Sequence, residues 1–215
     1  MNNNYIKIVV LGAISGGGTT NIVNILNGGI FNPEAPSSCG ASYIGKKIKI
    51  DQQEYNLDIW DAGGGQEKYR SLKKLFIKDS DIIILVHDLE YNKDSLDGIN
   101  YWYKTIKEEI LFTNEPIICI FANKIDLIDH KNNDIELSNF AESKGIKLKY
   151  VSAKTNSQMI LYYTMELVLD YFKYSHITTI YYSEFGELKL GKEELLSSNN
   201  NEKEYVKILS KYYNY

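Results

Sequence analysis

The sequence predicts an α/β protein: an open, mostly parallel sheet with helices on both faces. Two short and nearly uninterrupted apolar runs, "DIIILVHD" (81–88) and "PIICIFAN" (116–123), are typical of strands buried on both sides. Stretches with helical periodicity separate these runs from each other and from the next strand-like segment. Such an alternation of strand and helix indicates a parallel sheet, which binds its ligands at the carboxyl ends of its strands.

Length and composition are those of a globular protein with one domain, or one domain plus an appendage. The chain has 215 residues, 44% of them hydrophobic, and a net charge of −4, which gives no reason to expect a nucleic-acid partner. No segment is apolar enough over sufficient length to span a membrane. Cys39 and Cys119 are the only cysteines in the sequence, so we expect no disulfide framework. We expect a reducing, cytoplasmic setting instead.

Each expected element has a local reason. The first strand is rich in residues of high β-propensity and leads into a glycine loop. The first helix ends at Gly28 and Gly29, and the polar "DQQ" connects the two strands of a hairpin. A loop rich in Pro, Ser and Gly precedes that hairpin, over 31–45. We expect strands at 5–11, 46–50, 54–60, 81–88, 116–123 and 146–152. We expect helices at 19–27, 66–78, 93–111, 133–144 and 156–173.

The glycine loop after the first strand has the spacing of a phosphate-binding loop. In "VVLGAISGGGTTN" (9–21) the pattern G-x-x-x-x-G-K-[ST] is met except that Gly18 replaces the lysine. Backbone N–H groups of such a turn, backed by a helix N-terminus, can cradle phosphate. The candidate phosphate-binding residues are Gly12, Ala13, Ile14, Ser15, Gly16, Gly17, Gly18, Thr19 and Thr20.

Three more polar motifs each follow a strand of their own. Asp61 can hold Mg²⁺, and Gly64 can bring its N–H close to a terminal phosphate. "NKID" (123–126) and "SAK" (152–154) end two later strands, and Asp126 can accept two hydrogen bonds from a guanine edge. Each motif alone has an ordinary structural explanation, such as a cap or a turn. Four of them in this order favour a nucleotide site.

With these motifs the sequence resembles the Rab branch of the Ras-like small GTPases over about residues 5–173. "LDIWDAGGGQEKYRSL" is similar to the family's W-D-T-A-G-Q-E-x-[FY]-R segment, and "HDLEYNKDSLDGINYWYKTI" to a Rab stretch that ends in a helical tryptophan. The resemblance implies a P-loop G domain over 1–173, with a six-stranded, mostly parallel sheet flanked by about five helices.

The resemblance also implies ligands and roles. It implies GTP or GDP as ligand, with Mg²⁺ held by Thr19, Ser38 and Asp61, and Gln66 as the catalytic residue. It implies effector and regulator proteins bound through 31–45 and 61–78, in vesicle traffic or related signalling. The guanine pocket is implied for Asn123, Lys124, Asp126, Ser152, Ala153 and Lys154, which match the family pattern without departure.

Three departures fall at the phosphate end. Gly18 replaces the family's lysine, so its ammonium is missing. Gly65 takes the position of the water-orienting glutamine, so Gln66 is either displaced by one place or realigned by a bulge. The bulky Ile14 stands at the loop position that faces the γ-phosphate. An ammonium about 3 Å from a phosphate oxygen is worth ~5 kcal/mol at an effective dielectric of 20, before desolvation. We therefore expect nucleotide binding weakened by roughly two to three decades and slow hydrolysis. The alternative is a pseudo-GTPase that acts as a non-catalytic scaffold.

Residues 174–215 extend past the resemblance. We expect a hairpin at 177–191 and a short amphipathic helix at 205–213, docked on the domain or available to a partner. No cysteine follows Cys119, so no prenyl anchor is expected in this chain. We expect a cytoplasmic protein that partners recruit to membranes.

Overall fold

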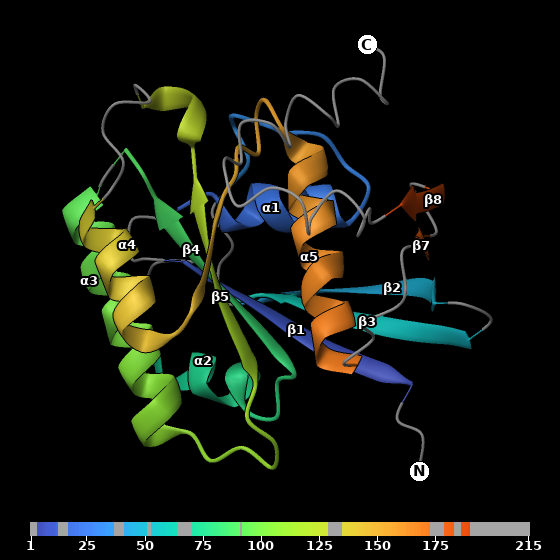
Figure 1. The fold of residues 1–215 in the computed structure, drawn as a ribbon, viewed down its shortest axis with the longest axis horizontal. Helices are drawn as coiled ribbons and strands as arrows, with labels where there is room; N and C mark the ends of the chain where they lie inside the picture. Colours follow the sequence, from blue (N-terminus) through green and yellow to red (C-terminus); the bar gives the residue numbers. More distant parts are fainter. Residues whose placement is uncertain are drawn as a thin grey trace.

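The predicted α/β fold is confirmed by a computed structural model of the chain. The structure describes residues 4–12, 17–36, 41–50, 53–63, 70–90, 92–128, 135–172, 179–182 and 186–189. A single twisted sheet runs through the molecule, with helices on both of its faces (Figure 1).

The six strands expected from the sequence form the body of the sheet. They are β1 (Tyr5–Gly12), β2 (Ser42–Ile50), β3 (Gln53–Asp61), β4 (Ile82–Asp88), β5 (Ile117–Asn123) and β6 (Lys147–Tyr150). Their order across the sheet is β6-β5-β4-β1-β3-β2, and all neighbours are parallel except the β2–β3 hairpin.

Five helices cover the two faces. They are α1 (Thr19–Leu26), α2 (Arg70–Ile77), α3 (Asn92–Lys104), α4 (Ile135–Lys144) and α5 (Ser157–Phe172). Alternate residues of the central strands point to opposite faces, so β1 sends Ile8 and Val10 to one side, and Val9 and Leu11 to the other. α1 and α5 pack on the first face, and α2, α3 and α4 on the second.

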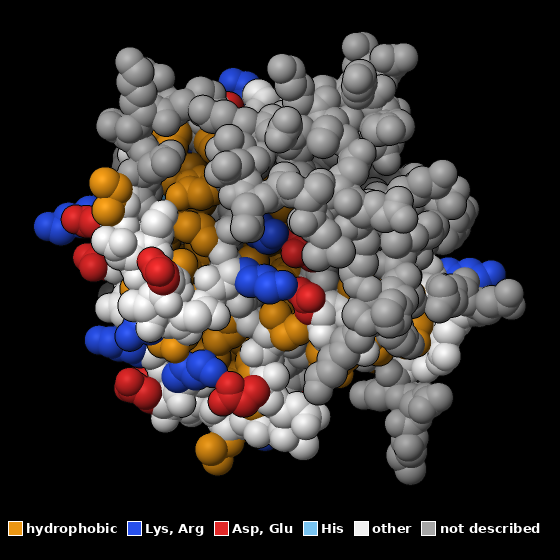
Figure 2. All heavy atoms as spheres, in the orientation of Figure 1, with side chains coloured by type: hydrophobic (Ala, Val, Ile, Leu, Met, Phe, Trp, Pro, Cys, Tyr) orange, Lys and Arg blue, Asp and Glu red, His pale blue; other side chains and the backbone are white. Residues whose placement is uncertain are grey.

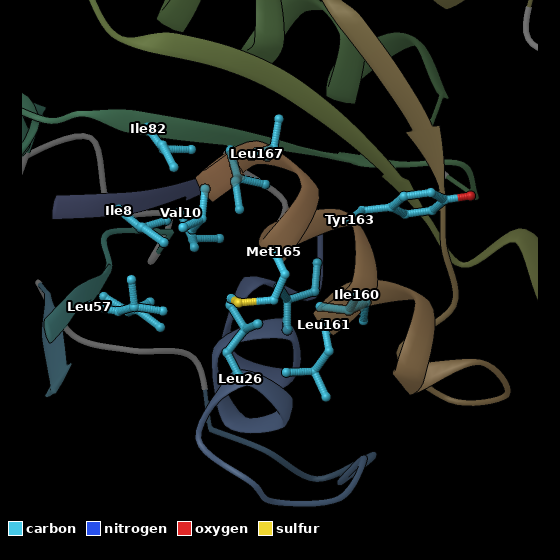
Figure 3. Packing of buried hydrophobic residues seen from close by; sticks show 14 of the residues in the cluster. Ile8, Val10, Leu26, Leu57, Ile82, Ile160, Leu161, Tyr163, Met165 and Leu167 are labelled. Atoms are coloured by element: carbon cyan, nitrogen blue, oxygen red, sulfur yellow. The ribbon is translucent and has the colours of Figure 1, made fainter. Parts of the chain in front are cut away.

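The face under α1 and α5 is a close-packed apolar layer. Figure 3 shows Ile8, Val10, Leu57 and Ile82 of the sheet opposite the side chains of α5, and Leu26 of α1 belongs to the same cluster. These strand residues are fully buried. Burial of such side chains, at about 25 cal/mol per Å² of apolar surface, makes the sheet a rigid platform for the loops at its edge.

Two element boundaries differ from the prediction. The loop expected over 31–45 ends earlier, because β2 begins at Ser42, where it pairs with Asp61 of β3. Pairing with the neighbouring strand decides this, and local composition does not report it. The helix expected at 93–111 leaves the α form at Lys104, and a π-helix at Thr105–Glu109 follows.

The sheet has two strands more than the six predicted. β7 (Thr179–Tyr182) and β8 (Gly186–Lys189) form an antiparallel hairpin, and β7 pairs with residues 48–50 of β2. The hairpin lies in the segment for which the sequence suggests one, but its place at the sheet edge had no local signal. The helix expected at 205–213 lies outside the described residues. Among the described helices, none has the length and apolarity needed to cross a bilayer.

Candidate functional site

The polar motifs lie together at one edge of the sheet, where four parallel strands end. Val10 of β1 pairs with Asp61 of β3, and Asp88 of β4 pairs with Asn123 of β5. β1 lies between β3 and β4 and ends at Gly12. Segments more than 100 residues apart in sequence are thereby brought to a common edge, which is where an open α/β sheet places its ligand.

Asn123 connects three of these segments by hydrogen bonds. Its Nδ2 donates to the carbonyl oxygen of Gly17 in the glycine loop (3.0 Å), and its Oδ1 accepts from the backbone N–H of Ala153 (3.1 Å). The side chain is only 2% exposed, so water does not compete for these bonds. The glycine loop and the "SAK" segment are therefore held to the end of β5 by one buried amide.

The two base-reading segments are also joined directly. The Ser152 hydroxyl donates to Oδ1 of Asp126 (2.6 Å) and accepts from the N–H of Thr155 (3.0 Å). Ser152 is buried, whereas Asp126 and Lys154 are exposed. The Asp126 carboxylate is thus oriented by the protein and still open to a ligand.

Lys124 is held by two carboxylates that sequence reasoning missed. Its backbone is left-handed (φ 68°), and its ammonium lies 2.7 Å from Asp88 Oδ2 and 3.1 Å from Glu90 Oε2. Partial burial lowers the pKa of Lys124, but the hydrogen bonds to Asp88 and Glu90 outweigh burial and raise it above its ordinary value. The sequence did contain a signal for Asp88, because this residue ends a buried apolar strand just as Asp61 does.

The glycines before α1 have a backbone that other residues rarely adopt. Gly17 has φ 26° and Gly18 has φ 86°, both in the left-handed region. A Cβ built on Gly18 would lie 2.6 Å from Nδ2 of Asn123. Gly18 precedes the first turn of α1, which contains no acidic residue and has no side-chain cap. The first N–H groups of a helix have no partner within the helix, and such groups suit an anion.

Asp61 has the surroundings of a metal-binding carboxylate. It is 1% exposed, its Oδ2 accepts from the Thr20 hydroxyl (3.0 Å), and its Oδ1 accepts from the N–H of Gly63 (3.0 Å). The Thr19 hydroxyl faces Gly63 so closely that a Cβ there would lie 1.9 Å from Oγ1. Within the described part of the chain, no group of three His, Cys, Asp or Glu side chains could hold a metal alone. One carboxylate beside two hydroxyls fits Mg²⁺ that takes its other ligands from phosphates and water.

Several predicted residues lie outside the described part of the chain. They are Ala13, Ile14, Ser15, Gly16, Ser38, Gly64 and Gln66. The described ones, from Gly12 to Lys154, lie on the strand ends or on the segments that follow them.

Comparison with known proteins finds relatives that belong to the Ras and Rab families. A model of the Ras family matches residues 7–184. The chain is 34% identical to Ras-related protein Rab-21 of Canis lupus familiaris over 151 residues, 70% of this chain and 66% of that protein. It is 30% identical to Ras-related protein Rab-7b of Mus musculus over 157 residues, 72% of this chain and 77% of that protein. It is 32% identical to Ras-related protein Rab-5B of Plasmodium falciparum over 158 residues, 72% of each chain. The match spans just under two thirds of the mammalian Rab-21 relatives, for example 66% in dog and 65% in human.

The Asn123 bonds can be tested by substitution. Asn123→Ala removes both bonds and leaves two buried backbone groups without a partner, so we expect the free energy of unfolding to fall by about 2–4 kcal/mol. Asn21→Ala is a matched control, because Asn21 also makes two hydrogen bonds, both with the backbone of Asn32, but at an exposed site. Water replaces those bonds, and we expect a loss below ~1 kcal/mol. Equal losses in urea unfolding of the two variants would contradict the role given to Asn123.

The backbone at Gly18 predicts that lysine does not fit there. Gly18→Ala and Gly18→Lys both place a Cβ in a left-handed backbone and against Asn123, so each should lose about 1–2 kcal/mol of stability. We expect neither to bind guanosine diphosphate more tightly than the original chain, as measured by titration with a fluorescent analogue. If Gly18→Lys gained tenfold in affinity and Gly18→Ala did not, the loop would have to adopt another conformation than the one observed.

Proposed function

Because the chain belongs to the Rab branch of the Ras family of small GTPases, we propose that it binds guanine nucleotides and acts as a switch protein in membrane traffic. The observation that supports this best is the hydrogen bonding of Asn123 to Gly17 and to Ala153. Through it, the candidate phosphate loop and one candidate base-reading segment are joined to the same strand end.

Guanine is the base that this site suits. The exposed carboxylate of Asp126, oriented by Ser152, can accept hydrogen bonds from the N1–H and the 2-amino group of guanine. Adenine offers neither of these two donors. A site that pairs buried or oriented polar groups with a base discriminates strongly against a base that leaves them unpaired.

Mg²⁺ is the cofactor we propose, held by Asp61 together with Thr19 and Ser38. When bound, the ion neutralises charge on the phosphate oxygens. Asp61 is held in place by the Thr20 hydroxyl and by the N–H of Gly63. The protein thus supplies a fixed anionic ligand and needs no reorganisation to present it.

Hydrolysis of GTP should be slow. The catalytic residue proposed is Gln66, one place beyond the usual slot, and Gly18 supplies no ammonium to stabilise charge on the transferred phosphoryl group. Gly18 has a left-handed backbone, which a lysine would rarely adopt. The missing ammonium is therefore linked to the conformation of the loop.

Partners are proposed to bind over 31–45 and 61–78, and Trp60 between these segments joins an aromatic side chain from each of them. The rings of Tyr43 and Trp60 are 5.1 Å apart, and those of Trp60 and Phe76 are 5.3 Å apart. Tyr43 is 51% exposed and nearby Leu75 is 68% exposed. Partly exposed aromatic groups on rigid strands are typical anchors of protein interfaces. In contrast, acidic and basic side chains are intermixed over the described part of the face in Figure 2, which does not suit a polyanion.

Binding is tested by titrating the protein with a fluorescent guanosine diphosphate analogue, with and without Mg²⁺. We expect saturable binding that Mg²⁺ strengthens. Asp126→Asn serves as the specificity control: its amide can donate to the 2-carbonyl of xanthine, so we expect at least tenfold weaker binding of the guanine nucleotide and a gain for the xanthine one. Absence of saturable binding would instead support the non-catalytic scaffold.

Turnover is tested by following phosphate release from GTP under single-turnover conditions. We expect slow release, at least tenfold below the rate of the mouse Rab-7b protein assayed alongside. A rate equal to that of Rab-7b would contradict the proposed effect of Gly18 and of the displaced Gln66.

A further inference from the structure

Trp102 makes a buried contact with the start of the glycine loop. It lies in α3, is 3% exposed, and donates a hydrogen bond from its indole Nε1 to the carbonyl oxygen of Gly12 (3.1 Å). Ninety residues separate the two partners in sequence. In the sequence, Trp102 is the tryptophan near the end of the stretch that is similar to the Rab family, and the sequence alone implies no role for it in the site.

The carbonyl of Gly12 needs a donor at this point. Gly12 is buried and is the last residue of β1, so it leads directly into the loop. A buried carbonyl without a partner costs free energy, and a carbonyl that faced a bound phosphate would repel it. The indole N–H meets both requirements, because it pairs the carbonyl and holds it toward α3.

The ring of Trp102 also lies in an apolar cluster that includes residues next to the loop and next to Asp61. It belongs to one buried apolar cluster with Leu11, next to the loop, and with Ala62, next to Asp61. Ala41, which precedes β2, packs at the margin of the same cluster. Trp102 and the ends of β1 and β3 therefore belong to one continuous apolar cluster, with the start of β2 at its margin.

We propose that Trp102 is a positioning residue for nucleotide binding: its indole N–H orients the Gly12 carbonyl away from the phosphates, and its ring carries changes at the site into α3. This inference rests on the proposed function, since it assumes that the loop binds a nucleotide.

The chain has two tryptophans, which allows a single-atom test. In a Trp60→Phe background only Trp102 remains, and it can be replaced by benzothienylalanine, which keeps the size of the indole but has sulfur in place of N–H. We expect the fluorescent guanosine diphosphate analogue to dissociate about tenfold faster from this protein than from the Trp60→Phe protein. Ile106→Ala in the same background is the matched control, because Ile106 is 2% exposed in the same cluster.

The control separates positioning from stability. We expect Ile106→Ala to lower the urea midpoint more than benzothienylalanine does, yet to leave the dissociation rate within about twofold of its background. Equal acceleration by both changes, or dissociation from the benzothienylalanine protein within twofold of its background, would overturn the inference.

The fluorescence of Trp102 gives a second, independent readout. In the Trp60→Phe protein we expect the tryptophan emission to change in wavelength or intensity when unlabelled guanosine diphosphate and Mg²⁺ bind, with the same midpoint as unlabelled guanosine diphosphate shows when it competes with the fluorescent analogue. Binding with no change in emission would overturn the link between Trp102 and the site. If the unmodified chain bound no nucleotide at all, the proposed function would fail as well, and this outcome is distinct from the other two.

Discussion

The site depends on one interaction above all, the pair of hydrogen bonds made by the buried amide of Asn123. A single side chain at the end of β5 binds the carbonyl of Gly17 and the N–H of Ala153, so it holds the glycine loop and the "SAK" segment to the same strand end. Because the amide has both a donor and an acceptor, it can join two backbone segments of opposite polarity, which neither a carboxylate nor an ammonium could do. The apolar layers on both faces of the sheet give it a fixed base.

The same amide explains why the departure at Gly18 is accommodated. A side chain at this position would meet Asn123 within 2.6 Å, and the φ of 86° favours glycine. The close approach of Asn123 to Gly18 and the left-handed backbone of Gly18 both disfavour a lysine at this position. The N–H groups at the start of α1 remain, and helix N-termini bind phosphate whether or not an ammonium is present.

Charge is distributed unevenly over the site. At the base end, Lys124 is neutralised by Asp88 and Glu90, and Asp126 is oriented by Ser152. At the phosphate end, Asp61 is bonded to neutral donors. A base carries no net charge and requires directional hydrogen bonds, which the oriented carboxylate of Asp126 can accept. The phosphate end retains an anion, and a cation must balance it when a nucleotide binds.

The sequence by itself determined the fold class, the order of the elements and the set of polar residues at the strand ends. Buried parallel strands are continuous apolar runs, and a polar residue that ends such a run is conspicuous. Only the tertiary structure decided which of these residues meet, as with Asp88 and Lys124 or Trp102 and Gly12. It also decided that β2 begins at Ser42 and that the β7–β8 hairpin extends the sheet, because strand pairing between distant segments has no local signature. Periodicity reports the environment of a residue, whereas hydrogen-bond partners across 30 to 100 residues are set by the packing of the whole chain.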